Sequence, residues 1–210
     1  MIPLSTLAAH VRELLKAPDE YPAIVPASAI ARARELLADT IAPYRWSDSQ
    51  LIGYSDDGLT ELAKIRSDVA ESGASTAYTA ALANYITYRA LALDNDAQNN
   101  NGALSDKFFN LFTSLSAATP YYFTDAQLTA YLKEAARQLA ALRPELRLDD
   151  EGTVMNDLYI EATATTPAGF SVPDRFGDAL AFFAAYRGAV HSKNDLANYF
   201  VEQFNSAAMR

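Results

Sequence analysis

The chain contains no cysteine, and this absence excludes disulfide bonds and thiolate metal sites. Histidine is scarce as well: His10 and His191 stand far apart, and neither belongs to a group with metal-ligand spacing. A His-Glu-x-x-His motif and a glycine-rich phosphate loop are also missing. We therefore predict no metal and no cofactor, and we interpret both histidines as ordinary surface or helix-end residues.

No stretch approaches the roughly 18 uninterrupted apolar residues of a membrane-spanning helix, so we expect no membrane partner. The first residues lack a basic region followed by an apolar run, so we expect no signal peptide. Basic residues are in deficit, with 17 Lys and Arg against 26 Asp and Glu and a formal net charge of −9. Such a surface repels phosphates, which argues against ordinary nucleic-acid binding but is compatible with a wall past which DNA moves.

Apolar residues make up 50% of the 210 residues, enough for one domain or for two small ones. They recur at spacings of three and four along most of the chain, which predicts amphipathic helices. The helix that begins at Ser47 or Asp48 illustrates the pattern. Its predicted buried face consists of Leu51, Tyr54, Leu59, Leu62 and Ile65.

One pattern occurs twice, around the single Trp and around a later Phe. Trp46-Ser47-Asp48-x-Gln50-Leu51 returns as Phe123-Thr124-Asp125-x-Gln127-Leu128, at an offset of 77 positions. We predict that Trp46 and Phe123 fill equivalent core positions, and that Asp48 and Asp125 are equivalent helix caps.

Two further blocks follow in the same order. Tyr88-Arg89 matches Tyr186-Arg187 at an offset of 98. The spacing of Leu104, Phe108 and Phe112 returns 92 positions later in the last predicted helix. The alternative is that amphipathic helices resemble one another without a common origin, but the shared order favours two copies of one unit.

One region of the second copy is not helical. Leu158, Ile160, Ala162 and Ala164 alternate with more polar residues, and this period of two predicts a strand, as one arm of a hairpin or as a sheet edge. The predicted fold class is therefore mainly α, with two tandem copies of a small helical-bundle unit and a short strand or hairpin insert in the second. The predicted divisions are an N-terminal helix with a proline-rich connector (1–27), a first unit (28–118) and a second unit (119–210) with its insert at about 153–170.

Carboxylates are the main candidates for catalysis. A pair drawn from Asp48, Asp56, Asp57 and Glu61 would suit glycoside hydrolysis, so a cell-wall hydrolase is one alternative function. Acidic chains always offer such pairs, and the cap explains Asp48 more simply. A second alternative is an acidic helical inhibitor of a host protein. We expect that the protein is not an enzyme.

The two Tyr-Arg pairs admit two interpretations. Each arginine could lie at the edge of an apolar stripe and pair with a carboxylate of its own unit. Each pair could also face a neighbouring subunit, because Tyr and Arg are enriched at interfaces.

Several segments together resemble the head-to-tail adaptor proteins of tailed bacteriophages, also called head-completion, neck or connector proteins. They are Leu36-Leu37-Ala38-Asp39, Tyr44-Arg45-Trp46-Ser47-Asp48, Arg143-Pro144-Glu145, Tyr88-Arg89-Ala90 and the Phe-containing last helix. The resemblance covers residues 28–208, twice over. No single segment is specific to this family, but their order is characteristic of it.

The resemblance implies a mainly helical structural protein of the virion neck, assembled in the host cytoplasm. It implies a closed homo-oligomeric ring, commonly of about twelve subunits, with contacts that run head to tail. Its partners would be the portal protein, a tail or nozzle protein, further copies of itself and, without sequence-specific binding, the genomic DNA in the channel. The candidates for subunit contacts are Tyr54, Arg66, Tyr88, Arg89, Tyr131, Arg143, Tyr159, Tyr186 and Arg187. The candidates for portal contacts are Tyr199, Phe200, Phe204, Met209 and Arg210.

Overall fold

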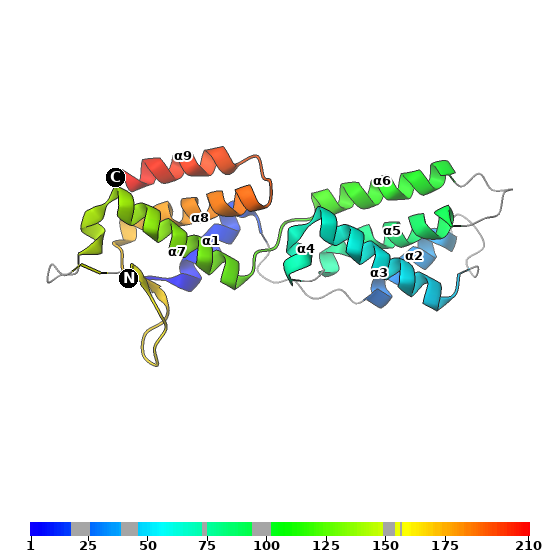
Figure 1. Ribbon diagram of the computed structural model, residues 1–210, viewed down its shortest axis with the longest axis horizontal. Coiled ribbons are helices and arrows are strands. Elements are labelled where there is room, and N and C mark those ends of the chain that lie inside the picture. Colours follow the sequence, from blue (N-terminus) through cyan, green and yellow to red (C-terminus); the bar gives the residue numbers. More distant parts are fainter. Residues whose placement is uncertain (18–25, 39–45, 73–74, 94–101, 149–153, 156) are drawn as a thin grey trace. The chain divides into compact units, whose positions relative to one another are not determined.

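The computed structural model describes residues 1–17, 26–38, 46–72, 75–93, 102–148, 154–155 and 157–210 (Figure 1). These residues are mainly helical, which confirms the predicted fold class. Most of the predicted connector and three motif residues, Asp39, Tyr44 and Arg45, lie outside the described residues. The chain divides into two compact units, unit 1 with Met1–Asp19 and Tyr121–Arg210, and unit 2 with Glu20–Pro120.

Unit 2 is built around one buried helix. Its elements are α2 (Pro26–Ala38), α3 (Asp48–Ile65), α4 (Ser67–Ser72), the 3₁₀ helix η1 (Thr76–Tyr78), α5 (Thr79–Ala92) and α6 (Gly102–Ala118). The helix α5 packs against α2, α3 and α6. Its residues are apolar on nearly all sides, as expected of a helix that neighbours surround.

Unit 1 repeats this plan with helices from both ends of the chain. Its elements are α1 (Leu4–Leu15), α7 (Asp125–Leu142), the 3₁₀ helices η2 (Pro144–Arg147) and η3 (Asp174–Phe176), α8 (Gly177–His191) and α9 (Ala197–Ala208). The helix α8 packs against α1, α7 and α9, and Figure 1 shows α1 in blue beside α7 and α8. The N-terminal helix, which the sequence analysis separated from both units, thus completes unit 1, and unit 2 is inserted between α1 and α7.

The strand insert forms a hairpin, but its strands are shorter than the sequence predicts. The strands β2 (Tyr159–Ile160) and β3 (Gly169–Phe170) pair antiparallel, and β1 (Ile2–Pro3) pairs with the other side of β3. The sheet order is therefore β1-β3-β2. A Cβ on Gly169 would stand 2.5 Å from the Ile2 carbonyl oxygen, so glycine permits this close pairing.

The prediction that Ile65 belongs to the buried face of α3 is wrong. Ile65 is 44% exposed, whereas Ser55 and Gly58 are buried with Leu51 and Leu62. Ile65 is the last residue of α3, and the side chain buried at this end is that of Arg66. At Gly58, a Cβ would stand 2.6 Å from Leu82 of α5. The closest approach of α3 to α5 is therefore centred on small residues that an apolar pattern does not mark. No described helix is both long and apolar enough to cross a membrane.

Candidate functional site

The segments with the repeated aromatic-Ser/Thr-Asp pattern begin α3 and α7 with the same capping box. The Ser47 side chain accepts from the Gln50 N–H at 3.3 Å, and the Gln50 side chain accepts from the Ser47 N–H at 2.9 Å. Thr124 and Gln127 repeat these two bonds at 3.2 Å and 2.9 Å. Each box satisfies N–H groups that the first turn leaves free.

The capping side chains are therefore the hydroxyls of Ser47 and Thr124, and the prediction that Asp48 and Asp125 are caps is wrong. Both aspartates stand at the first residue of their helix, where the helix dipole favours a negative charge. Each pairs with an arginine from the first helix of its own unit. Arg34 donates to Asp48, and Arg12 donates to Asp125.

Trp46 and Phe123 both lie in hydrophobic cores, with 7% and 1% of their surface exposed. Trp46 packs in the cluster of α2, α3 and α5. Phe123 packs in the core of unit 1, with its ring 4.8 Å from that of Tyr121.

Both Tyr-Arg pairs make the same contact inside their units. Arg89 of α5 pairs with Asp57 of α3 at 3.1 Å, and Arg187 of α8 pairs with Glu134 of α7 at 2.9 Å. Asp57 and Glu134 are also 77 positions apart in the sequence. The two guanidinium groups are thus already engaged with carboxylates of their own unit, and the adjoining Tyr88 and Tyr186 are half-buried.

Arg66 and Arg143 end α3 and α7, and each fastens its helix to the end of the last helix of its unit. Arg66 donates to the carbonyl oxygens of Ser116 and Thr119 at 2.9 and 2.7 Å. Arg143 donates to the carbonyl oxygen of Ala208 at 2.8 Å. Cations are favourable at helix C-termini, which are rich in free carbonyl groups.

The remaining candidates for subunit contacts are half-buried tyrosines. Tyr54 packs against the core of unit 2, and the Tyr131 ring lies 6.4 Å from that of Phe123. Tyr159, in β2, lies beneath the ammonium group of Lys133, which is 3.9 Å from the ring centre. All three side chains keep part of their surface exposed.

The candidates for portal contacts divide into two groups. Phe200 and Phe204 are 2% and 4% exposed, and their side chains belong to the core of unit 1. Tyr199, Met209 and Arg210 are exposed. Of the five candidates, only these three have exposed side chains.

The hairpin of unit 1 extends away from its helices, as the yellow segment of Figure 1 shows. Every residue from Ile160 to Thr165 is exposed. Among the described residues β2 pairs only with β3, and on its outer edge the Tyr159 N–H donates to the Asp157 side chain at 3.1 Å. Lys133 of α7 pairs with Glu161 at 3.3 Å and fastens the hairpin to the helix.

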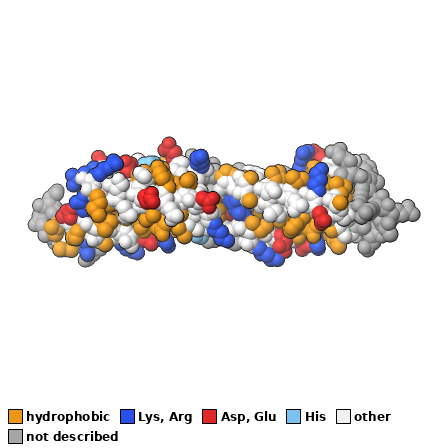
Figure 2. Space-filling model, turned by 90° about the horizontal axis from the view of Figure 1, so that it is seen from above, with side chains coloured by type: hydrophobic (Ala, Val, Ile, Leu, Met, Phe, Trp, Pro, Cys, Tyr) orange, Lys and Arg blue, Asp and Glu red, His pale blue; other side chains and the backbone are white. Residues whose placement is uncertain are grey.

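Large apolar side chains are exposed on the surface of both units. Figure 2 shows them in orange between the charged groups. In unit 2, Phe109 and Leu111 are 41% and 38% exposed. In unit 1, the end of α7 and the segments after it expose Leu142, Leu148, Val154 and Met209. Amphipathic spacing identified several of these residues but could not tell which of them a neighbouring helix covers.

An aromatic pair recurs between the buried helix and the last helix of each unit. Tyr85 contacts Phe112, and Phe183 contacts Phe204, with 5.0 Å between ring centres in both pairs and edge-on geometry. Burial raises the pKa of the Tyr85 hydroxyl above its ordinary value, and the nearby Arg89 partly opposes this shift. In unit 1 the corresponding residue is Phe183, which has no hydroxyl group.

The carboxylates proposed for hydrolysis are mostly ion-paired. Asp48 pairs with Arg34, Asp57 with Arg89, and Glu61 with Lys64. Within the described ranges, no group of three His, Asp or Glu residues could hold a metal ion. Each of these three carboxylates therefore has a basic partner within unit 2.

Comparisons of the chain with protein-family models, with curated proteins and with solved structures find no match.

Proposed function

We propose that the protein is a head-to-tail adaptor of a tailed bacteriophage, a structural component that forms a ring between portal and tail around the DNA channel. The observation that carries the proposal is the ordered set of adaptor-like motifs, which occurs twice in the sequence. The motif residues hold equivalent contacts in the two units, including the capping boxes and the Arg89–Asp57 and Arg187–Glu134 pairs. We infer that the chain contains two copies of one adaptor unit.

The exposed surfaces support a role in assembly. A ring needs two different surfaces on each subunit, which meet head to tail and close. Apolar side chains such as Phe109 and Leu142 are exposed on the units, and no described strand covers the outer edge of β2, where a strand of another chain could add in place of the Tyr159–Asp157 hydrogen bond. The formal charge of −9 suits a channel wall to which DNA phosphates do not bind.

The β2 edge supplies a test of the subunit contact. We expect Ile160→Lys to weaken ring formation, because a charge on an edge strand disfavours further strand pairing. Thr165→Lys is the matched control, since it adds the same charge in the exposed turn outside the paired residues. Equal ring formation by both variants would show that this edge is not a subunit contact.

The partner is tested by co-expression with the portal protein encoded in the same genome. We expect the two proteins to copurify, and electron microscopy to show the adaptor as a ring stacked on the portal. Copurification with tail proteins but never with the portal would contradict the proposed position in the neck.

A further inference from the structure

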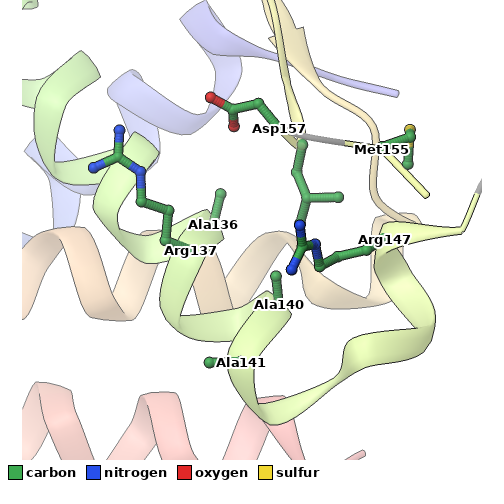
Figure 3. A pocket seen from close by; sticks show the side chains of 8 residues that line it. Ala136, Arg137, Ala140, Ala141, Arg147, Met155 and Asp157 are labelled. Carbon is green, nitrogen blue, oxygen red and sulfur yellow. The ribbon is translucent and has the colours of Figure 1, made fainter.

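A cavity of about 280 Å³ lies on unit 1, between the second half of α7 and the segment that leads into the hairpin (Figure 3). Its lining residues are Ala136, Arg137, Ala140, Ala141, Arg147, Met155, Asp157 and Leu158. The small alanine side chains form one wall of the cavity, and the longer side chains form the rest of its lining.

Two exposed arginines line this cavity. Figure 3 shows Ala136 and Ala140 between the side chains of Arg137 and Arg147. Across the described part of the chain, neither guanidinium group makes a hydrogen bond or an ion pair. The nearest acidic residue on α7, Glu134, is engaged by Arg187.

One carboxylate also lines the cavity and limits the ligand that fits. Asp157 accepts a hydrogen bond from the Tyr159 N–H at 3.1 Å, and so helps to shape the start of β2. Two arginines and one aspartate leave a formal charge of about +1 in the cavity. This balance favours a ligand with one negative charge, such as a carboxylate, over a doubly charged phosphate.

The cavity belongs to the second copy alone. The residues 77 positions before Arg137 and Arg147 are Thr60 and Ala70. The wall formed by Met155, Asp157 and Leu158 comes from the insert, which the first copy lacks. The cavity is therefore an addition to the shared helical plan and is not required by it.

Exposed apolar side chains surround the same end of unit 1. Leu148 and Val154 form an isolated β-bridge and are 48% and 59% exposed. Leu142 and Met209 are also exposed, and they adjoin the Arg143–Ala208 hydrogen bond, which joins the ends of α7 and α9. Exposed apolar side chains beside a polar cavity are typical of a protein-binding surface.

We propose that this cavity binds one carboxylate side chain of a partner protein, within a peptide segment whose neighbouring residues are apolar. The guanidinium group of Arg147, which Figure 3 shows reaching toward Ala140, donates to the carboxylate, with which arginine forms bidentate hydrogen bonds, while Arg137 adds positive charge at the rim. The apolar neighbours of the carboxylate cover Leu142, Leu148, Val154 and Met209. The inference goes beyond the proposed function and does not depend on it, because it names a ligand chemistry rather than an assembly.

The test is a titration of the ¹⁵N-labelled full chain, followed by amide chemical shifts. The probe is the peptide N-acetyl-Leu-Glu-Leu-amide, and the matched peptide with Gln in place of Glu is the control. We expect saturable shifts at Ala140, Ala141 and Met155 with the Glu peptide, and binding weaker by about tenfold or more with the Gln peptide.

Variants separate the site from general attraction to positive charge. We expect Arg147→Gln to weaken binding of the Glu peptide by about tenfold or more, and Arg147→Lys to restore part of it. Arg175→Gln is the control, because Arg175 is another exposed arginine of unit 1, lies outside the cavity and stacks on the Phe176 ring. The unperturbed amide spectrum elsewhere in each variant verifies the fold.

Three results would overturn the proposal. They are equal affinity for the Glu and Gln peptides, equal loss of binding in Arg175→Gln and Arg147→Gln, and no saturable shift at millimolar peptide. The titration is repeated with inorganic phosphate at the same concentration. Binding of phosphate as tight as that of the Glu peptide would contradict the choice of a carboxylate ligand.

Discussion

At the scale of single residues, Arg66 is the most heavily engaged side chain of unit 2. It pairs with Asp68 through Nε at 3.0 Å, and Asp68 also accepts from the Tyr78 hydroxyl at 2.9 Å. Arg66 and Asp68 are 8% and 2% exposed. The corresponding pair in unit 1, Arg143 with Glu145, is 3.4 Å long and largely exposed. The same position is therefore a buried network in one unit and a surface contact in the other.

We predict that Arg66→Ala lowers the free energy of unfolding of unit 2 by about 3 to 5 kcal/mol, because Asp68 would be left buried and unpaired. Arg143→Ala is the matched variant and should cost about 1 kcal/mol, the value of an ordinary hydrogen bond. Urea denaturation followed by circular dichroism measures both. Similar losses in the two variants would refute the distinction between the buried and the exposed pair.

The Tyr85 hydroxyl links stability to alkaline pH. Because burial raises its pKa above the ordinary value of 10.0, the neutral form stabilises the fold below pH 10.0. That contribution is lost as the pH rises through the higher folded-state pKa, since the ionised form is disfavoured in the fold. We expect Tyr85→Phe to lose less stability than the unchanged protein above pH 10.0.

Phenylalanine should fit at this position, because Phe183 fills the equivalent place in unit 1. Thermal unfolding at neutral pH and above the ordinary tyrosine pKa makes the comparison. Tyr199→Phe, at an exposed position, is the control and should behave as the unchanged protein. The account of Tyr85 would fail if its variant and this control lost stability equally at high pH.

At the scale of the elements, α3 contains two glycines in different surroundings. A Cβ at Gly53 would have no atom within 4 Å, whereas a Cβ at Gly58 would stand 2.6 Å from Leu82 and 2.8 Å from Tyr85. Gly53→Ala should stabilise the protein by about 1 kcal/mol through helix propensity. Gly58→Ala should gain the same propensity but lose about 1 to 3 kcal/mol through overpacking.

The measurement is the urea midpoint of each variant, with an unchanged m-value showing that the unfolding transition is the same. We expect the Gly53→Ala midpoint to rise and the Gly58→Ala midpoint to stay level or fall. If Gly58→Ala stabilised the protein as much as Gly53→Ala does, the inference that α3 and α5 pack closely at Gly58 would be wrong.

The sequence predicted elements best where a local signal marks them. The cap candidates Ser47 or Asp48, and Asp125, located the starts of α3 and α7 within one residue. The strand was placed in the correct region, but alternation continued beyond the two residues of β2 that pair. The third strand of the sheet, β1, pairs with β3 from the N-terminus, and a local pattern contains no information about that distant partner.

At the scale of the whole molecule, the chain makes two helical units, and the second lies within the sequence of the first. The sequence showed that α1 has an apolar face but not what covers it, because its partners α7 and α8 are more than a hundred residues away in the chain. The contacts of the candidate residues also could not be predicted from the sequence. The sequence matched Arg89 with Arg187 and made Arg66 and Arg143 candidates for subunit contacts. Only the structure shows that each of the four is engaged within its own unit.

The cavity beside Arg147 was not predicted, since its residues come from α7, η2 and the insert. No repeat or spacing connects them. The clearest trace of the cavity in the sequence is a difference between the two copies, because Arg147 stands where the first copy has Ala70.

The central claim is that this protein assembles as a ring, and native mass spectrometry tests it most directly. The full chain is measured alone and after mixing with the portal protein. We predict one discrete closed species of about twelve copies in at least one of the two samples. A chain that stays monomeric in both, and adds no mass to the portal, would contradict the account.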